Sequence, residues 1–170
     1  MNQLTDYEMG EILDYQQVYF LGLDAHKIKG SPANEFNYGY DDERGDYRTV
    51  KHDHISYRYE VLEFLGKGSF GQALRCFDYK KNSYVALKII RNKKRFHHQA
   101  AVEVKILAHL RDNDPNDHYN IIRMKDYFVF RRHLCITFEL LSINLYEFIK
   151  NNNFQGVSIG LIRRFAIQIL

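Results

Sequence analysis

The glycine-rich segment GKGSFG at residues 66–71 constrains this chain more than any other feature. Its glycines follow the spacing G-x-G-x-x-G, and a backbone without Cβ atoms can lie close against a ligand. Lys88 stands 17 residues after Gly71, at the end of the apolar run VALK. A lysine on a neighbouring strand reaches back to whatever the glycines cover. The pairing therefore predicts a nucleotide phosphate held beneath a β-hairpin lid.

A dinucleotide-binding turn is the main rival interpretation of this glycine spacing. That motif requires a helix that opens at the third glycine and an acidic residue about 20 positions further on. In this chain β-favouring residues follow Gly71, and position 88 holds lysine. The sequence therefore favours the hairpin lid.

The hydrophobic pattern predicts an α+β chain whose strands surround one helix. Apolar alternation indicates strands, and apolar residues at helical spacing indicate helices. Strands are expected at residues 59–65, 73–77, 84–90, 121–130 and 134–140, and helical segments at 96–112, 144–150 and 158–170.

Glu103 falls on the apolar stripe of the expected helix at residues 96–112. A carboxylate there is costly unless it is paired. Strand alternation places Lys88 on the same face as Ala86 and Ile90, so the lysine also points inward among apolar neighbours. Each charge needs the other, and the sequence predicts a Lys88–Glu103 ion pair. The alternative is that Glu103 snorkels to solvent at the edge of the helix.

The first 58 residues carry weaker signals. Thr5 and Glu8 form a capping-box pattern at the start of a short helix. Residues 27–48 are rich in Gly, Asn, Asp and Ser and are expected to form an extended linker with a turn at Gly45. The run His52–His54 contains three adjacent metal-ligand types, but neighbours in an extended chain point to alternate sides. No distant cluster has zinc-like spacing, so a hydrogen-bonded anchor is the preferred interpretation.

Composition excludes several classes of protein. The net charge is +3, from 24 basic and 21 acidic residues, which is too weak and dispersed to indicate nucleic-acid binding. Cys76 and Cys135 lie in apolar runs and are expected to be buried free thiols, as in a reducing compartment. No basic-then-apolar leader pattern and no apolar run of membrane-spanning length occurs. We expect a soluble protein of the cytoplasm, the nucleus or both, whose oligomeric state stays open.

Several motifs resemble the dual-specificity tyrosine-phosphorylation-regulated kinases (the DYRK family). They are GKGSFGQ, VALKIIRNKKRFHHQA, ITFELLSINLYEFIK and NNNFQG. YDDERGDY followed by HDHISYRYEV resembles the DYRK homology box, and LTDYEMGEILDYQQVYFLG resembles the accessory region of class II members. The resemblance implies an accessory region and homology box at 1–58. It implies an incomplete kinase domain at 59–170, with a five-stranded antiparallel amino-terminal lobe, one helix and the start of the helical carboxy-terminal lobe.

The resemblance also implies roles in binding ATP. The glycines would cover the phosphates, Lys88 would hold the α- and β-phosphates, and Glu103 would orient Lys88. Leu65 and Ala86 would sandwich the adenine, and Phe138 would close the back of the pocket. The implied nucleotide-binding residues are Leu65, Gly66, Lys67, Gly68, Ser69, Phe70, Gly71, Gln72, Ala73, Ala86, Lys88, Phe138, Glu139, Leu140, Leu141 and Asn144.

By resemblance, the reaction would be ATP-dependent phosphorylation of protein substrates, with autophosphorylation on tyrosine and later action on serine and threonine. Mg²⁺ would serve the full-length enzyme. The 170 residues contain no H-x-D-L-x-x-x-N, DFG or APE segment, and they end at Leu170 inside an expected apolar helix. We therefore expect a truncated chain that has no kinase activity alone. Two alternatives stay open, namely a binding module or decoy without catalysis, and a nucleotide-binding regulator.

One residue of the implied site departs from the family pattern. The position two after the last glycine is usually valine, which packs on the adenine, but this chain has Ala73. At about 0.8 kcal/mol per buried CH₂, the missing methyl groups are expected to weaken ATP binding by up to about 1–1.5 kcal/mol.

Overall fold

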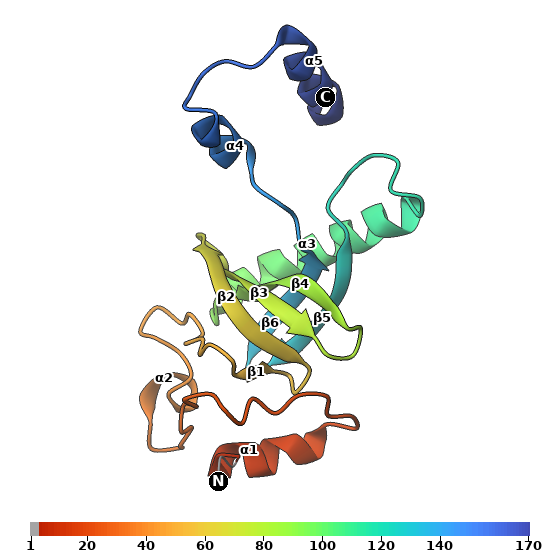
Figure 1. Cartoon of the computed structure of the whole chain (residues 1–170). Helices are drawn as coiled ribbons and strands as arrows, with labels where there is room; N and C mark the ends of the chain where they lie inside the picture. Colours follow the sequence, from red (N-terminus) through yellow and green to blue (C-terminus); the bar gives the residue numbers. More distant parts are fainter. Residues whose placement is uncertain (1–3) are drawn as a thin grey trace.

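A computed structural model describes residues 4–170 of the chain. Figure 1 shows a curled sheet with helices on both sides and two helices further along the chain. The helices are α1 (Asp6–Glu11), the 3₁₀ turn η1 (Ile12–Asp14), α2 (Glu35–Tyr38), α3 (Lys94–Asn113), α4 (Leu145–Asn151) and α5 (Ile159–Ile169). The strands are β1 (His54–Ile55), β2 (Tyr59–Lys67), β3 (Gly71–Asp78), β4 (Ser83–Ile90), β5 (Met124–Phe130) and β6 (His133–Glu139).

The strands form one antiparallel sheet in the order β1-β2-β3-β4-β6-β5. The five predicted strands and the helix between the third and fourth are therefore confirmed. The structure adds the two-residue strand β1 at one edge. Strand β5 begins at Met124, three residues later than predicted, because Ile121 to Arg123 leave the sheet. Irregular register along β2 bends the sheet at its glycine-rich end.

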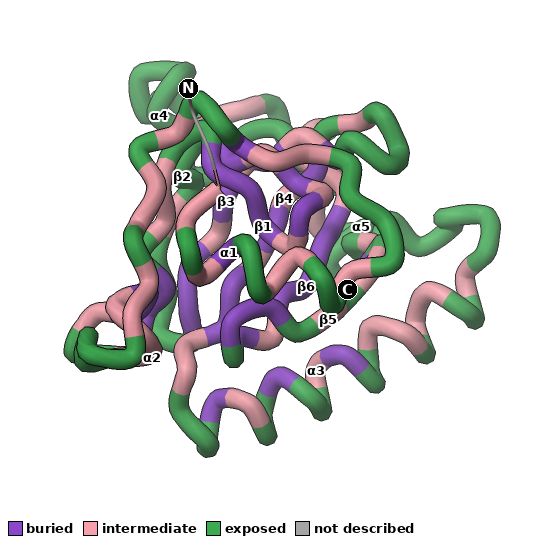
Figure 2. Tube along the Cα trace, turned by 90° about the horizontal axis from the view of Figure 1, so that it is seen from below, coloured by how far each residue is buried: buried purple, intermediate pink, exposed green. Residues whose placement is uncertain are grey.

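The amino-terminal segment covers one face of the sheet, called here the outer face. Tyr40 and Tyr47 are buried in the same apolar cluster as Leu74, Leu87 and other side chains of β2, β3, β4 and β6. Figure 2 shows the buried strands beneath this segment. The prediction of a linker at residues 27–48 is thus wrong for its second half, because the tyrosines bury too much apolar area to remain extended in solvent.

A buried ionic cluster joins α1 to the strand β1. Glu8 accepts hydrogen bonds from Lys27 at 2.7 Å and from His54 at 2.8 Å, and Lys27 also binds Asp53 at 2.7 Å. Ligand-type atoms of Glu8, Asp53 and His54 lie within 4.8 Å of one another, a spacing that a metal ion would suit. The Lys27 ammonium, however, already pairs with both carboxylates, and the Arg131 guanidinium lies 3.5 Å from Glu8. The anchor predicted around His54 is confirmed as a hydrogen-bonded structural site.

Arg131, in the turn between β5 and β6, connects the same helix to the sheet. Its guanidinium donates to Glu11 at 2.8 Å and to the Tyr47 hydroxyl at 2.9 Å. The group also lies 4.0 Å from the centre of the Tyr40 ring, so it combines ionic, hydrogen-bonding and cation–π contacts. Because its side chain is only 1% exposed, the contacts form in the interior and fix α1 against the sheet.

Helix α3 packs on the opposite, inner face. Val104 joins Ile136 and Phe138 in one cluster, and Phe96 and Ala100 join Ile90 in another. These positions repeat at helical spacing, as the sequence predicted. The helix therefore crosses the strand that carries Lys88.

The last two helices lie beyond the sheet, after the segment that follows β6 (Figure 1). Asn144 caps α4 and Ser158 caps α5, each through a side-chain oxygen that accepts a backbone N–H. Both helices leave large apolar side chains exposed, including Leu145, Ile162 and Ile167. Within residues 4–170, no helix has the length and apolar character needed to cross a bilayer.

Candidate functional site

The glycine-rich loop joins β2 to β3 through a turn in which the Gly68 N–H donates to the Gly71 carbonyl at 2.8 Å. Gly71 has a φ of +156°, and a Cβ built there would lie 2.0 Å from the Ile89 carbonyl oxygen. Only glycine fits this position. A Cβ at Gly66, in contrast, would meet no atom within 4 Å. The protein's own packing therefore does not require glycine at Gly66, which leaves the backbone open to a ligand.

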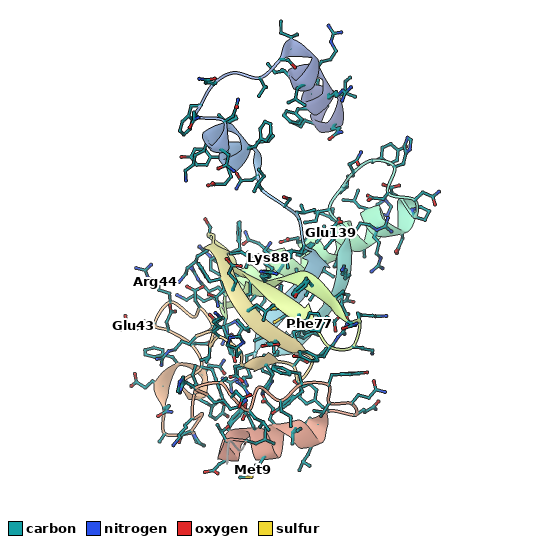
Figure 3. The ribbon with its side chains drawn as sticks, in the orientation of Figure 1. Met9, Glu43, Arg44, Phe77, Lys88 and Glu139 are labelled. Atoms are coloured by element: carbon teal, nitrogen blue, oxygen red, sulfur yellow. The ribbon has the colours of Figure 1, made fainter. Side chains whose placement is uncertain are left out.

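Lys88 and Glu103 form the predicted ion pair. The Lys88 ammonium lies 2.6 Å from a Glu103 carboxylate oxygen, between β4 and α3. Their side chains are 28% and 37% exposed, so the pair is more open than the sequence suggested. Lys88 lines the cleft beneath the glycine loop, near the upper end of the sheet in Figure 3, and Glu103 holds its ammonium from α3. A cation held in this way can bind an anionic group that enters the cleft.

The cleft has a volume of about 430 Å³. Most of its walls are backbone and apolar side chains, and Lys88 supplies the positive charge. The lining residues are Gly66, Gly68, Phe70, Gly71, Gln72, Ala73, Ala86, Leu87, Lys88, Ile122 and Phe138. Apolar walls with one directed cation are what a flat aromatic base carrying phosphates requires.

Seven residues of the implied nucleotide site lie outside this lining. Asn144 is occupied as the cap of α4, where it accepts from the Glu147 N–H at 2.8 Å. The Glu139 carboxylate accepts from the Arg123 N–H at 2.9 Å, at the end of β6 (Figure 3). The other five are Leu65, Lys67, Ser69, Leu140 and Leu141. Their roles in binding ATP stay predictions.

Gln72 contributes its backbone to the cleft and its side chain to the opposite face of the sheet. It borders the cleft, but its side chain donates to the Tyr47 carbonyl at 2.5 Å on the outer face. Strand alternation accounts for this, since Gln72 shares a face with the buried Leu74. The side chain therefore faces the amino-terminal segment, and only the backbone of Gln72 is available to a nucleotide.

Sequence reasoning missed two lining residues. Leu87 is fully buried in the outer-face cluster, so it contributes backbone to the cleft. Ile122 stands before β5 and is 39% exposed. The pair Ile121–Ile122 after a polar loop marked an apolar position but gave no sign that it faces the cleft. That placement depends on where the chain leaves the sheet.

The cleft suits ATP better than it suits a metal ion. Backbone N–H groups of the loop and the Lys88 ammonium can bind phosphate oxygens, and Ala73, Ala86 and Phe138 offer apolar contact to a base. Mg²⁺ binds through carboxylate and other oxygen ligands. No carboxylate occurs among the lining residues of the described chain, and the nearby Glu103 is paired with Lys88. These residues do not make a magnesium site by themselves.

Comparison with known proteins identifies relatives for this arrangement. Residues 59–170 match the family model of the protein kinase domain. The chain is 59% identical to the human dual specificity tyrosine-phosphorylation-regulated kinase 4 over 169 aligned residues. The aligned part covers 99% of this chain and 32% of the relative. It is 56% identical to the Caenorhabditis elegans dual specificity tyrosine-phosphorylation-regulated kinase mbk-2 over 168 aligned residues. The aligned part covers 99% of this chain and 21% of the relative.

A more distant relative gives the same result. The probable serine/threonine-protein kinase dyrk2 of Dictyostelium discoideum is 52% identical over 170 residues, which is 100% of this chain and 18% of the relative. The chain thus spans a third or less of the length of these relatives. Its curled antiparallel sheet, its lysine–glutamate pair and its sequence agree: the chain belongs to the protein kinase domain family, within the dual-specificity tyrosine-phosphorylation-regulated kinases.

Proposed function

We propose that residues 59–170 form the ATP-binding part of a dual-specificity protein kinase. The observation that carries this proposal is the 2.6 Å Lys88–Glu103 pair beside a cleft roofed by a glycine-rich loop. Phosphoryl transfer depends on positioning and on neutralising phosphate charge, and a fixed lysine contributes to both. The proposed substrates are ATP and proteins that accept phosphate on serine, threonine or, by autophosphorylation, tyrosine.

Each part of the cleft has a distinct task in this proposal. Lys88 attracts the α- and β-phosphates, and Glu103 holds the ammonium in the orientation that meets them. Ala86 and Phe138 contact the base. Magnesium, when bound, neutralises the developing charge on the phosphates, but its ligands are expected outside residues 1–170.

A transfer assay on the longest natural form of the protein that contains these residues tests the proposal. Labelled phosphate should appear on tyrosine of the protein itself and on serine or threonine of a protein substrate. Lys88→Ala should reduce transfer by two or more orders of magnitude, as expected when a major positioning contact is removed. Lys81→Ala, at an exposed turn far from the cleft, serves as the matched control. Equal activity of the two variants would overturn the assignment.

For the 170-residue chain alone we propose binding without catalysis. Its sequence contains no catalytic-loop or DFG segment, and those segments supply the catalytic base and the metal ligands in protein kinases. Turnover above that of Lys88→Ala would contradict this proposal. A thermal shift with ATP separates the remaining alternatives: a nucleotide-binding regulator is stabilised by ATP, whereas a decoy that only captures partners is not.

We also propose that the protein resides in the cytoplasm, the nucleus or both. Cys76 and Cys135 support this, because both are buried free thiols and neither forms a disulfide. Cell fractionation followed by detection of the endogenous protein tests the proposal. Recovery from a secreted or membrane-bound fraction would refute it.

A further inference from the structure

The acidic segment at residues 40–47 touches the glycine-rich loop from outside. The Lys67 ammonium, at the end of β2, lies 2.7 Å from an Asp46 carboxylate oxygen. Gln72, at the start of β3, donates to the Tyr47 carbonyl at 2.5 Å. The two contacts fall on either side of the loop. The outer segment therefore holds both strands that lead into the site, and Glu43 projects to solvent beyond them (Figure 3).

Asp46 is itself fixed to the strand that carries Lys88. Its carboxylate receives two hydrogen bonds from Arg91, at 2.8 and 3.0 Å, just after the end of β4. The Asp46 N–H donates to the Asp42 carboxylate at 2.9 Å, which closes the turn through Gly45. The Asp46 side chain is only 3% exposed. One carboxylate thus joins the glycine loop to the end of the lysine strand.

The loop has few other restraints. Its residues Lys67 to Phe70 are exposed, and added Cβ atoms at Gly66 or Gly68 would meet nothing closer than 4.0 Å. The Gly68–Gly71 backbone bond closes the turn, and a bond from the Arg91 N–H to the Phe70 carbonyl at 2.9 Å ties its tip to the end of β4. The Phe70 ring also packs edge-on against Phe96, with the ring centres 5.8 Å apart, but Gly66 and Gly68 themselves make no packing contact and keep high conformational freedom. The height of the loop glycines above the cleft therefore depends on the contacts at the Phe70 tip and on the bonds at the two ends of the loop.

We propose that Asp46 is a positioning residue for the nucleotide phosphates. By pairing with Lys67 and Arg91, it sets the glycine loop at a fixed distance from Lys88, so that loop amides and the ammonium meet the same phosphate groups. Asp46 touches no nucleotide in this arrangement. The inference deepens the proposed function and rests on it, because it assumes that ATP is the ligand of the cleft.

A purely stabilising role for Asp46 makes a different prediction. The Lys67 side chain is 39% exposed, and surface ion pairs of this kind contribute little to folding stability. Lys67→Met should therefore leave the unfolding midpoint almost unchanged. If the pair serves only stability, that variant has no other effect; if it positions the loop, loop motion and ATP binding change.

Hydrogen exchange and ATP binding, measured on the longest natural form, test the inference. In Lys67→Met and Asp46→Asn, the amides of residues 66–72 should exchange faster, and the ATP dissociation constant should rise about two- to five-fold, the range of one exposed ion pair. Arg75→Met is the matched control. Arg75 is 38% exposed, pairs with Glu63 at 3.6 Å within the same hairpin, and lies 4.8 Å from the centre of the Tyr84 ring on the next strand.

The outcomes separate the inference from the proposed function. Unchanged loop exchange and ATP affinity in Lys67→Met overturn the inference even if Asp46→Asn fails to fold. An equal effect of Arg75→Met also overturns it. If the unmodified protein binds no ATP, the proposed function fails, whereas loop exchange still reports whether the contact holds the loop. Additive effects of the two substitutions in the double variant would show that Lys67 and Asp46 act separately and would contradict the inference.

Discussion

At the scale of single residues, two glycines of one motif have different reasons to be glycine. Gly71 is required by the protein, because a side chain there would strike the Ile89 carbonyl. Gly66 has space around it, so its requirement comes from the ligand that the loop is proposed to cover. The same distinction between folding and binding separates Gln72, which faces the outer segment, from Ala73, which faces the cleft.

Substitution of Gly71 tests the first of these reasons. Gly71→Ala should destabilise the protein by about 1–3 kcal/mol, the cost of a strained backbone position, or more where the clash forces β3 away from β4. Gly66→Ala should change the unfolding free energy by less than about 1 kcal/mol. Urea unfolding of both variants measures the difference. Equal loss of stability at the two positions would show that the loop adopts another conformation.

Ala73 carries a prediction about affinity. It lines the cleft and lies opposite Lys88 in the strand register. Ala73→Val should tighten ATP binding by about 1–1.5 kcal/mol, or roughly tenfold, by restoring apolar contact with the base. Titration of ATP against the longest natural form measures the change. An unchanged dissociation constant would contradict the expected contact.

At the scale of elements, the local sequence specifies where α1 begins, but distant residues hold the helix in place. The capping box is confirmed, since the Thr5 N–H donates to Glu8 at 2.9 Å and the Glu8 N–H donates to Thr5 at 3.3 Å. A helix of 6 residues is too short to be stable alone. Its position depends on Arg131, which is 120 residues from its partner Glu11.

Arg131→Met should therefore detach α1 from the sheet. Removing one partner of a buried ion pair costs about 3–5 kcal/mol, because the remaining charge is buried without compensation. Arg132→Met is the control, since the neighbouring side chain is exposed and should cost less than about 1 kcal/mol. Chemical unfolding gives the stability, and proteolysis after residues 11–20 reports release of the helix. Equal stability of the two variants would refute the anchoring role.

At the scale of the whole molecule, the sheet lies between two layers that come from different parts of the chain. The amino-terminal segment covers its outer face, and α3 covers part of its inner face beside the cleft. Buried charged groups, rather than hydrocarbon alone, join the outer layer to the sheet. The stability of the molecule should consequently depend on pH.

His54 and Glu8 set the direction of that dependence. Burial lowers the pKa of His54 although Glu8 accepts its hydrogen bond. Its Nδ1 accepts the Tyr57 N–H, so Nε2 carries the proton and the ring is neutral. Burial alone would raise the pKa of Glu8, but hydrogen bonds from His54, Lys27 and Thr5 outweigh burial and lower it.

As the pH falls, His54 and Glu8 therefore bind protons at a higher pH in the unfolded chain than in the folded chain. The contribution of His54 is complete above about pH 6.5 and is lost as the pH falls through its lowered folded pKa. The contribution of Glu8 is complete above about pH 4.5 and is lost below that value. Melting temperatures between about pH 8 and pH 2 should fall in two stages, the first from His54 and the second, below about pH 4.5, from Glu8. In His54→Gln, which keeps a donor and an acceptor, the first stage should become shallower; a parallel profile would refute the assignment.

Part of the candidate site follows from sequence alone. Local pattern placed the glycine loop in a hairpin, and periodicity put Lys88 and Glu103 on facing sides of a strand and a helix. Their pairing needed only that each charge have a partner. The exposure of the pair and the position of Ile122 did not follow, because neither depends on local periodicity.

The sequence by itself determined the five longer strands, the α3 helix, the capping box of α1 and the Lys88–Glu103 pair. The strands, the helix and the cap depend on neighbours within a few positions, and the pair depends on the need of each inward-facing charge for a partner. Only the tertiary structure decided that residues 40–47 pack on the sheet and contact the glycine loop. Those residues lack alternation and helical spacing, and their partners Lys67, Gln72 and Arg91 lie 21 to 45 residues away. Contacts of that range form when the sheet brings distant segments together, and no local signal encodes them.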